Sequence, residues 1–427
     1  MKELAIVVPC INEADNLEIL LPRLHTVAAS LHIDYEITII DGGSTDGTSE
    51  VAEENGARAI AQRGQGYGGA LKTAFEDTDS RFVITLDADL SHHPAIVGFL
   101  YRARRQAEVL IASRYAKNGF AQMPIGRKFL SWVLNGVFRN MLSMPVGDMS
   151  SGFRLYHRSV LDSIEIKHPT YAVLQELLIK SYCKGFRIAE APFHYRPRRH
   201  GSSHARVFKF GRDYLSVLWE MWHLRNCVES ADYDTRAFYS RIPFQRWWQR
   251  KRYAIITDWI GERLNVLDVG CGSTQILEGA PQSIGLDIQL QKLRYMRRPG
   301  RGLVNGSIMQ LPFKDESFEV VVCSQVIEHI PKDKAVLDEL TRLVKPGGRL
   351  ILGTPDYGSW QWPMLEKMYD FFKPLGYAEE HISHYTRDEL KSLMREAGLD
   401  VRGCRTICEG EMVVLGAKPR TDEESQV

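Results

Sequence analysis

The segment FVITLDADLSHHP at residues 82–94 determines how the first half of the chain is expected to fold. Its first five residues are mostly apolar and β-branched, which predicts a strand that is covered on both faces. Asp87 and Asp89 follow, and alternation along an extended strand would point both carboxylates the same way. Neighbouring carboxylates repel unless a cation lies between them, and their oxygens suit Mg²⁺ or Mn²⁺. The segment therefore predicts a strand that ends in a divalent-metal site, with a helix beginning near Pro94. A turn that happens to hold two aspartates is the alternative.

The flanking sequence repeats an alternation of strand and helix. AIVVP at 5–9 and EITII at 36–40 predict two more buried strands, and an amphipathic helix is expected between them. This order predicts parallel strands joined by right-handed crossovers. Ligands of such sheets bind beyond the carboxyl ends of the strands, so polar residues at those ends should converge. These residues are Pro9, Asn12, Asp41, Asp87 and Asp89.

Length and composition limit the classes of protein to consider. The chain has 427 residues, which predicts two or three domains, and a net charge of +1, which gives no electrostatic reason to expect nucleic acid as a partner. Its seven cysteines are dispersed and no secretory leader is recognisable, so we expect reduced thiols and a cytoplasmic location. Since no run of about 18 apolar residues occurs, no membrane-spanning helix is expected.

The ordered motifs of the first half resemble family 2 glycosyltransferases with the GT-A fold, and within them the polyprenyl-phosphate sugar transferases of the dolichol-phosphate mannosyltransferase type. The motifs are VPxxNE at 8–13, DGGSxDGT at 41–48, DxD at 87–89, ASRY at 112–115, RK at 127–128, SGFR at 151–154 and ELL at 176–178. The resemblance covers about residues 4–220. It implies a nucleotide-sugar donor near Pro9, Glu13 and Asp41, with metal and diphosphate at Asp87 and Asp89. Ser91 stands where many relatives have glutamine, which puts a third metal ligand from this loop in doubt.

Sugar transfer requires that the diphosphate leaving group be neutralised, which a metal ion can do. Arg114 and Arg127 are candidates to hold the phosphates because a guanidinium matches phosphate oxygens; a surface ion pair is the alternative. A hydroxyl acceptor would need a general base, for which Glu176 and Asp148 are candidates, whereas an ionised phosphate acceptor needs none. Acceptor contacts are expected at Ser151 and Arg154.

Beyond Pro192 the chain is basic, and no acidic residue occurs in 191–212. Apolar residues at helical spacing follow, with Trp219 and Trp222 beside them. This predicts a basic amphipathic helix that lies in a membrane interface, or alternatively packs against its own domain. We expect a polyprenyl-phosphate acceptor and peripheral binding at the inner face of a membrane, with a soluble glycan hydroxyl as the alternative acceptor. The candidate acceptor-binding cations are Arg196, Arg198, Arg199 and Arg206.

A second set of motifs begins with NVLDVGCGS at 265–273, which predicts a strand entering a glycine-rich turn where the main chain can approach a ligand. IGLD at 284–287 predicts a strand whose terminal acid can accept from ribose hydroxyls. Together with MQLPF at 309–313, VIEHI at 326–330 and LVKPGGRL at 343–350, this set resembles class I methyltransferases that use S-adenosylmethionine. The resemblance covers about residues 253–419 and implies a Rossmann-like fold. The cofactor residues that carry over are Asp268, Gly270, Gly272 and Asp287. Ser307 and Ile308 are expected near the adenine, but Ser307 stands where relatives usually have an acidic residue that meets the adenine amine, which puts this contact in doubt.

The expected architecture is α/β, with a GT-A domain at 1–225, a linker at 226–252, a methyltransferase domain at 253–419 and a disordered tail at 420–427. Glu328 and His329 are expected to face the methyl acceptor, with His329 as a packing residue as the alternative, and residues 357–384 are expected to cover the substrate. The predicted function is that of a bifunctional enzyme, which transfers a hexose from a nucleotide sugar and a methyl group from S-adenosylmethionine. One alternative is an RNA-modifying methyltransferase whose first domain only binds, and another is a scaffold with inactive sites.

Overall fold

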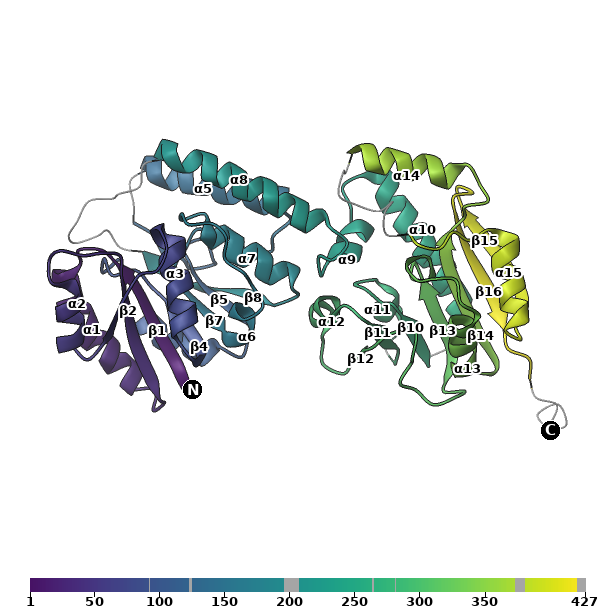
Figure 1. Cartoon of the computed structure of the whole chain (residues 1–427), viewed down its shortest axis with the longest axis horizontal. Helices are drawn as coiled ribbons and strands as arrows, with labels where there is room; N and C mark the ends of the chain where they lie inside the picture. Colours follow the sequence, from purple (N-terminus) through teal and green to yellow (C-terminus); the bar gives the residue numbers. More distant parts are fainter. Residues whose placement is uncertain are drawn as a thin grey trace. The chain divides into compact units, whose positions relative to one another are not determined.

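The computed structural model describes residues 1–91, 93–122, 125–195, 207–262, 265–280, 282–372 and 381–420. The chain forms two compact units, Met1–Arg225 (unit 1) and Asn226–Val427 (unit 2), whose elements are labelled in Figure 1. Each unit has a mostly parallel seven-stranded sheet among its described residues, so the α/β prediction is confirmed. Within the described residues, no helix combines the length and the apolarity needed to cross a bilayer.

The main sheet of unit 1 has the order β3-β2-β1-β4-β7-β5-β8. The predicted parallel pairing is confirmed for β1 with β2 and β4, but β7 runs antiparallel between β4 and β5. The strands are β1 (Lys2–Cys10), β2 (Tyr35–Asp41), β3 (Arg58–Ala61), β4 (Ser80–Thr85), β5 (Val109–Ser113), β7 (Arg154–His157) and β8 (Ile188–Pro192), and β6 (Phe120–Ala121) pairs with β9 (His194–Tyr195). Because β4 ends at Thr85, Asp87 and Asp89 lie in the following loop, and the argument from strand alternation does not apply to them.

Helices cover both faces of this sheet because β1 alternates buried side chains between two apolar clusters. Ile6 and Val8 pack with α1 and α4, whereas Ala5 and Val7 pack with α3 and α7. Pro94 is the N-cap of α4, as the sequence predicted. The helices are α1 (Ala14–Ala29), α2 (Thr48–Glu54), α3 (Gly66–Asp77), α4 (Ala95–Ala103), α5 (Ile125–Met141), α6 (Arg158–Leu161), α7 (Val173–Cys183) and α8 (Val207–Asn226).

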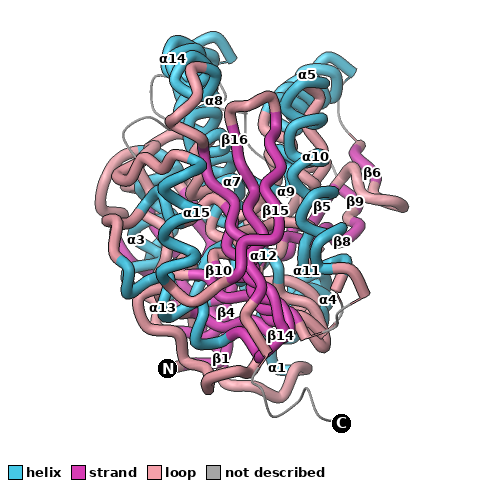
Figure 2. The backbone as a smooth tube through the Cα atoms, turned by 90° about the vertical axis from the view of Figure 1, so that its right-hand side faces the viewer, coloured by secondary structure: helices cyan, strands magenta, loops and turns pink. Residues whose placement is uncertain are grey.

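The sheet of unit 2 has the order β12-β11-β10-β13-β14-β16-β15, in which only the pairs of β16 with β14 and β15 are antiparallel. The strands are β10 (Val266–Val269), β11 (Ile284–Asp287), β12 (Gly302–Asn305), β13 (Phe318–Ser324), β14 (Val344–Pro355), β15 (Asp400–Ile407) and β16 (Glu411–Ala417). The helices are α9 (Tyr233–Phe238), α10 (Pro243–Ile260), α11 (Ile276–Gly279), α12 (Leu290–Met296), the 3₁₀ turn η1 (Ile327–His329), α13 (Lys334–Leu343), α14 (Gln361–Phe372) and α15 (Arg387–Glu396). Figure 2 shows α10 and α15 on opposite sides of β15 and β16.

The segment 226–252, expected as a linker, supplies α9 and the first half of α10 to unit 2. Trp248 Nε1 donates to Glu411 Oε2 at 2.6 Å, and Arg252 donates to both carboxylate oxygens of Glu411 at 2.5 and 2.6 Å. Glu411 is fully buried, so these bonds offset the cost of removing its charge from water. Residues 421–427 of the expected tail lie outside the described residues.

Candidate active sites

The first candidate site lies at the carboxyl ends of β1 and β2, where a network of hydrogen bonds fixes two loops. Asn12 has φ 54°, and its Oδ1 accepts from Thr45 N at 2.8 Å. Asp41 Oδ1 accepts from Ser44 N at 2.8 Å, and Asp41 Oδ2 accepts from Ser49 Oγ at 2.7 Å. Burial alone would raise the pKa of Asp41, but the hydrogen bonds from Ser44 and Ser49 outweigh it and lower the pKa. Asp41 is therefore an ionised carboxylate that also orders its own turn.

Pro9 and Glu13 lie at the same edge. Pro9 is opposite Ile40 in the register of β1 and β2. Glu13 follows β1, and its main-chain amide donates to Thr48 Oγ1 at 3.0 Å. Its side-chain Oε2 accepts from Asn16 Nδ2 at 2.5 Å. Both residues thus reach the edge where Asp41 ends its strand.

Asp87 and Asp89 lie in the loop after β4, beside the strand end of β1. Asp87 is half-buried, whereas Asp89 is 4% exposed and accepts from Ser91 N at 3.0 Å. A Cβ on Gly152 would lie only 2.7 Å from Tyr67 Oη and 3.6 Å from Asp87 Oδ1. Tyr67 Oη therefore packs closely against the main chain at Gly152, beside Asp87, and the carboxylates share an edge with Asp41, as the sequence predicted.

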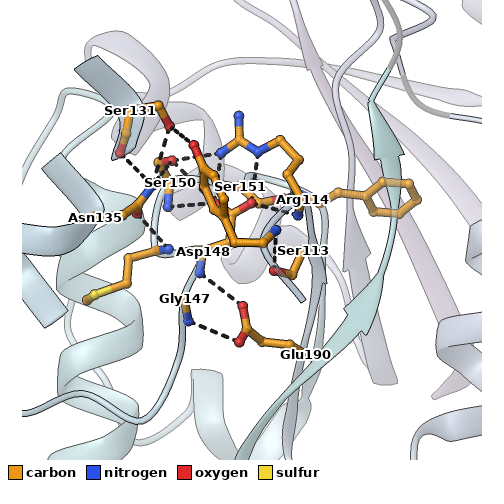
Figure 3. A network of polar contacts seen from close by, with 12 residues as sticks. Ser113, Arg114, Ser131, Asn135, Gly147, Asp148, Ser150, Ser151 and Glu190 are labelled. Atoms are coloured by element: carbon orange, nitrogen blue, oxygen red, sulfur yellow. Dashed lines mark hydrogen bonds and ion pairs between the residues drawn. The ribbon is translucent and has the colours of Figure 1, made fainter. Parts of the chain in front are cut away.

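Arg114 forms a buried ion pair with Asp148, which Figure 3 shows at the centre of a polar network. Its Nε and Nη2 donate to the two carboxylate oxygens at 2.8 and 2.7 Å, and Nη2 also donates to Ser150 Oγ at 2.7 Å. Glu190 accepts from the amides of Gly147 and Asp148 at 3.0 and 2.9 Å. Burial opposes ionisation of Asp148, but Arg114 keeps its pKa below the usual value. A paired carboxylate of low pKa is a weak proton acceptor, which argues against Asp148 as a general base.

Glu176, the other candidate base, is fully buried at the start of α7. It accepts from the main-chain amides of Lys167 and His168 at 3.0 Å each, and from Lys180 Nζ at 2.5 Å. These partners indicate that Glu176 holds the loop before α7 rather than a substrate.

Arg154, expected at the acceptor, is also fully buried. Its Nη1 donates to Leu174 O at 2.7 Å and its Nη2 donates to Met149 O at 2.8 Å. Ser151 is 6% exposed and accepts from Phe153 N at 3.3 Å. Arg154 thus joins the main chain at Met149 to the main chain at Leu174. Arg127 lies in α5, but its side chain is outside the description, and Arg196, Arg198, Arg199 and Arg206 lie outside the described residues.

The second candidate site is a cavity of about 640 Å³ within unit 2. It opens where β10, β11 and β13 end, the usual ligand position of a doubly wound sheet. All six cofactor residues expected from the sequence line it, namely Asp268, Gly270, Gly272, Asp287, Ser307 and Ile308.

Asp287 orders the glycine-rich turn of this cavity. Its Oδ2 accepts from Gly272 N and its Oδ1 accepts from Gln289 N, each at 2.7 Å. Gly270 has φ 68°, and a Cβ there would lie 2.2 Å from Val326 Cγ2, so only glycine fits without rearrangement. The turn therefore brings main-chain amides close to the cavity and next to a carboxylate, an arrangement that fits a cofactor with ribose hydroxyls.

Two charged residues near this turn were missed in the sequence. Asp234, in α9, accepts from Ser273 N at 2.9 Å and pairs with Lys292 Nζ at 3.1 Å. Burial alone would raise the pKa of Asp234, but the charge of Lys292 lowers it. No local motif identifies Asp234, because it lies in the segment that was expected to be a linker.

The same cavity is also lined by His329, one of the two residues expected at the methyl acceptor. His329 lines the cavity together with His381, Ile382, Trp362 and Glu366, so part of the expected cover at 357–384 does border it. Residues 373–380 of that cover lie outside the described residues. Glu328 is fully buried; its Oε2 accepts from Thr354 Oγ1 at 3.1 Å, and burial raises its pKa to about 8.

Comparison with known proteins assigns a family to each unit. Residues 5–165 match the family model described as "Glycosyl transferase family 2", and residues 267–352 match the one described as "Methyltransferase domain". The dolichol-phosphate mannosyltransferase of Pyrococcus furiosus is 28% identical over 233 residues, which cover 51% of this chain and 64% of that protein. The polyprenol monophosphomannose synthase of Mycolicibacterium smegmatis is 29% identical over 216 residues, which cover 46% of this chain and 79% of that protein.

Among solved structures, glucosyl-3-phosphoglycerate synthase from Mycobacterium tuberculosis, in complex with Mn²⁺, uridine diphosphate and phosphoglyceric acid, aligns with 52% of this chain and 78% of its own. Its TM-score is 0.43 at 22% identity. The two family matches fall in different units, in the order that the sequence motifs predicted. The chain therefore joins a glycosyltransferase family 2 domain to a methyltransferase domain.

Proposed function

We propose that unit 1 transfers a hexose from a nucleotide sugar to a polyprenyl phosphate with the help of Mg²⁺ or Mn²⁺, and that unit 2 methylates a sugar, a lipid-linked glycan or a small molecule with S-adenosylmethionine. The observation that carries the first activity is the convergence of Asp41, Asp87 and Asp89 at one edge of the sheet.

The residues at this edge fit a hard divalent ion. Asp87 and Asp89, in the loop after β4, offer carboxylate oxygens, which Mg²⁺ and Mn²⁺ prefer. A bound ion would neutralise the charge of the departing diphosphate. Asp41, at the end of the neighbouring strand, is ionised and so suited to accept hydrogen bonds from the nucleoside. Arg114 binds Asp148 and Ser150, so we assign it to fixing the position of the loop that holds these two residues.

Two helices of unit 1 support an acceptor at a lipid surface. In α8, Val217 and Met221 are buried in the core, whereas Trp219 is 64% exposed. In α5, Phe129 and Trp132 are 64% and 63% exposed. Aromatic side chains exposed on helices that also pack inward are suited to a membrane interface, where the acid-free basic segment 191–212 would meet anionic headgroups. The relatives named as polyprenol- and dolichol-phosphate transferases agree with this acceptor.

The second activity is supported by the cavity of unit 2. Its volume of about 640 Å³ is in the range of small-molecule sites. Asp287 would accept from ribose hydroxyls, while Ser307 and Ile308 border the position expected for adenine. S-adenosylmethionine supplies the methyl group when bound. The role of the chain is to hold it next to His329 and His381, which line the same cavity.

The test of sugar transfer is a screen of nucleotide sugars with the full chain, Mn²⁺ and a short-chain polyprenyl phosphate. Asp89→Ala should abolish metal-dependent transfer and leave S-adenosylmethionine binding unchanged. Asp79→Ala is the matched control, because this aspartate is 77% exposed at the opposite end of β4. Transfer by wild type that persists in a chelator would contradict the metal assignment.

The acceptor is tested with vesicles of phosphatidylcholine and phosphatidylglycerol. Replacing Trp132 and Trp219 by alanine should reduce co-sedimentation and transfer to lipid phosphate while sparing donor binding. Trp360→Ala is the control, because this tryptophan is 69% exposed in unit 2. Undiminished transfer to a water-soluble hydroxyl acceptor, with no activity on lipid phosphate, would favour the soluble-glycan alternative and refute the lipid acceptor.

A further inference from the structure

Glu328, His329 and His381 form a cluster of metal-ligating side chains beside the cavity of unit 2. One ligand atom from each residue lies within 4.8 Å of the other two. Glu328 and His329 belong to η1, just after β13, whereas His381 comes from the segment that precedes α15. Main-chain hydrogen bonds hold these two segments together, because Glu328 O accepts from the amides of Ile382 and Ser383 at 2.8 and 2.9 Å. The three side chains are therefore held as a unit even though His381 is distant in sequence from the other two.

Glu328 carries an unsatisfied atom in this cluster. Its side chain is fully buried, and Oε2 accepts from Thr354 Oγ1 at 3.1 Å, but Oε1 has no hydrogen-bond partner among the described residues. A buried carboxylate oxygen without a partner is costly, and such an atom in a folded protein points to a bound water or ion. A cation next to Oε1 would satisfy it and would stabilise the ionised form.

His381 is oriented by a second set of partners, as metal-binding histidines are. Its Nδ1 lies 2.8 Å from Tyr357 Oη and 3.1 Å from Glu366 Oε1, and Tyr357 Oη also donates to Glu366 Oε1 at 2.9 Å. A carboxylate beside Nδ1 favours the tautomer with the proton on that nitrogen. In this tautomer Nε2 carries the lone pair that a metal ion would use.

We propose that Glu328, His329 and His381 bind one divalent transition-metal ion, such as Zn²⁺, Fe²⁺ or Co²⁺, at the acceptor end of the methyltransferase cavity. Two imidazoles and one carboxylate suit such ions better than Mg²⁺ or Ca²⁺, which prefer oxygen ligands. Four-coordinate metal bonds of about 2.0–2.2 Å place ligand atoms about 3.3–3.6 Å apart. Small side-chain rotations that bring the three atoms together would therefore complete the site.

Three protein ligands leave at least one coordination position for an exchangeable ligand, which is the arrangement of catalytic metal sites. His329 and His381 both line the cavity, so this position would face the space next to the proposed cofactor. The ion would there bind an oxygen atom of the methyl acceptor and would make a hydroxyl more acidic. The methyl acceptor is thus assigned to compounds with a hydroxyl or a carboxylate. This assignment rests on the proposed methyltransferase activity, whereas metal binding itself does not.

The test is titration of the chelator-treated full chain with Co²⁺ and Zn²⁺, followed by visible absorption and calorimetry respectively. Wild type should bind one equivalent that Glu328→Gln and His381→Ala weaken by at least about tenfold. His384→Ala should keep this equivalent, because it removes an exposed imidazole three residues away that stacks on Tyr357. Asp89→Ala should keep it as well, which separates it from an ion bound in unit 1.

Two further measurements make the outcome decisive. S-adenosylmethionine binding by the same variants reports whether unit 2 is folded. If wild type fails to bind the cofactor but binds Co²⁺, the proposed function fails and the metal site stands.

X-ray absorption of wild type with one equivalent of Zn²⁺ should show scattering from two imidazoles, independently of any variant. The proposal is overturned if wild type binds neither Co²⁺ nor Zn²⁺ saturably, if folded Glu328→Gln and His381→Ala bind as wild type does, or if imidazole scattering is missing.

Discussion

Asp268→Asn should change how the stability of unit 2 depends on pH. Asp268 ends β10 at the glycine-rich turn and is 2% exposed. Burial, together with the nearby carboxylates of Asp287 and Asp234, raises its pKa from 3.8 to about 8, against a weak hydrogen bond from Thr274 Oγ1 at 3.3 Å. Lys292, the cation in this group, is already paired with Asp234. The folded unit therefore keeps a proton on Asp268 at pH values where the unfolded chain has lost it.

The sign and the size of the effect follow from this difference. A carboxyl group whose pKa is raised by folding contributes stability at low pH, and this contribution is lost as the pH rises toward the folded-state pKa. Each pKa unit corresponds to about 1.4 kcal/mol, so the loss between about pH 5 and about pH 8 is on the order of 4 kcal/mol. Asparagine has no proton to release. The free energy of unfolding of the variant, minus that of wild type, should therefore increase with pH by this order of magnitude.

The assay must resolve unit 2, because a chain with two units does not unfold in one two-state transition. Hydrogen exchange with mass spectrometry, measured along a urea series for peptides from β10 and β13, gives the local free energy of opening at each pH. Glu328 also has a raised pKa, but it is present in both proteins and cancels in the difference. A difference between variant and wild type that stays constant from about pH 5 to about pH 8 would refute the reasoning, because it would show that Asp268 titrates alike in both states.

Three other substitutions test the remaining contacts. Asp148→Asn removes the anion from a buried ion pair and should lower the free energy of unfolding of unit 1 by about 3 kcal/mol in urea; unchanged protection of β5 and β7 would contradict this. Asp287→Ala should weaken S-adenosylmethionine binding by about 1–3 kcal/mol in calorimetry, and equal affinity would remove the cofactor placement. Gly270→Ala forces a Cβ to 2.2 Å from Val326 and should lower the thermal midpoint of unit 2 far more than Gly300→Ala, where φ is also positive but the space is open.

Sequence alone was enough to identify the elements that carry both sites. β1, β2, β10 and β11 are short apolar runs, and the polar residues at their ends are their neighbours in the chain. Asp41 and Asp287 are therefore placed at a sheet edge by local pattern together with the rule that parallel strands end on the same side. The same reasoning gave no prediction for the antiparallel β7, because its pairing with β4 and β5 joins residues far apart in sequence and leaves no local period.

The direction in which a side chain points was predicted less well than its position. Arg154 and Glu176 occupy motif positions that suggest substrate contacts, yet both are buried and bind main-chain groups. A motif indicates which residue type occupies a position in the fold, but it does not indicate whether the side chain contacts a substrate or holds a loop by hydrogen bonds to the main chain. Only the neighbours brought in by tertiary packing, such as Leu174 O beside Arg154, distinguish the two roles.

The proposed metal cluster shows why packing also creates sites that no motif contains. Glu328 and His329 are adjacent in the sequence, but a carboxylate and one imidazole are too few ligands for a tightly bound transition metal. The third ligand arrives because Glu328 O accepts from the amides of Ile382 and Ser383, and this contact brings His381 next to the pair. These two main-chain hydrogen bonds thus also bring the three proposed metal ligands together. A substitution that breaks this main-chain contact should therefore weaken metal binding even though it removes no ligand.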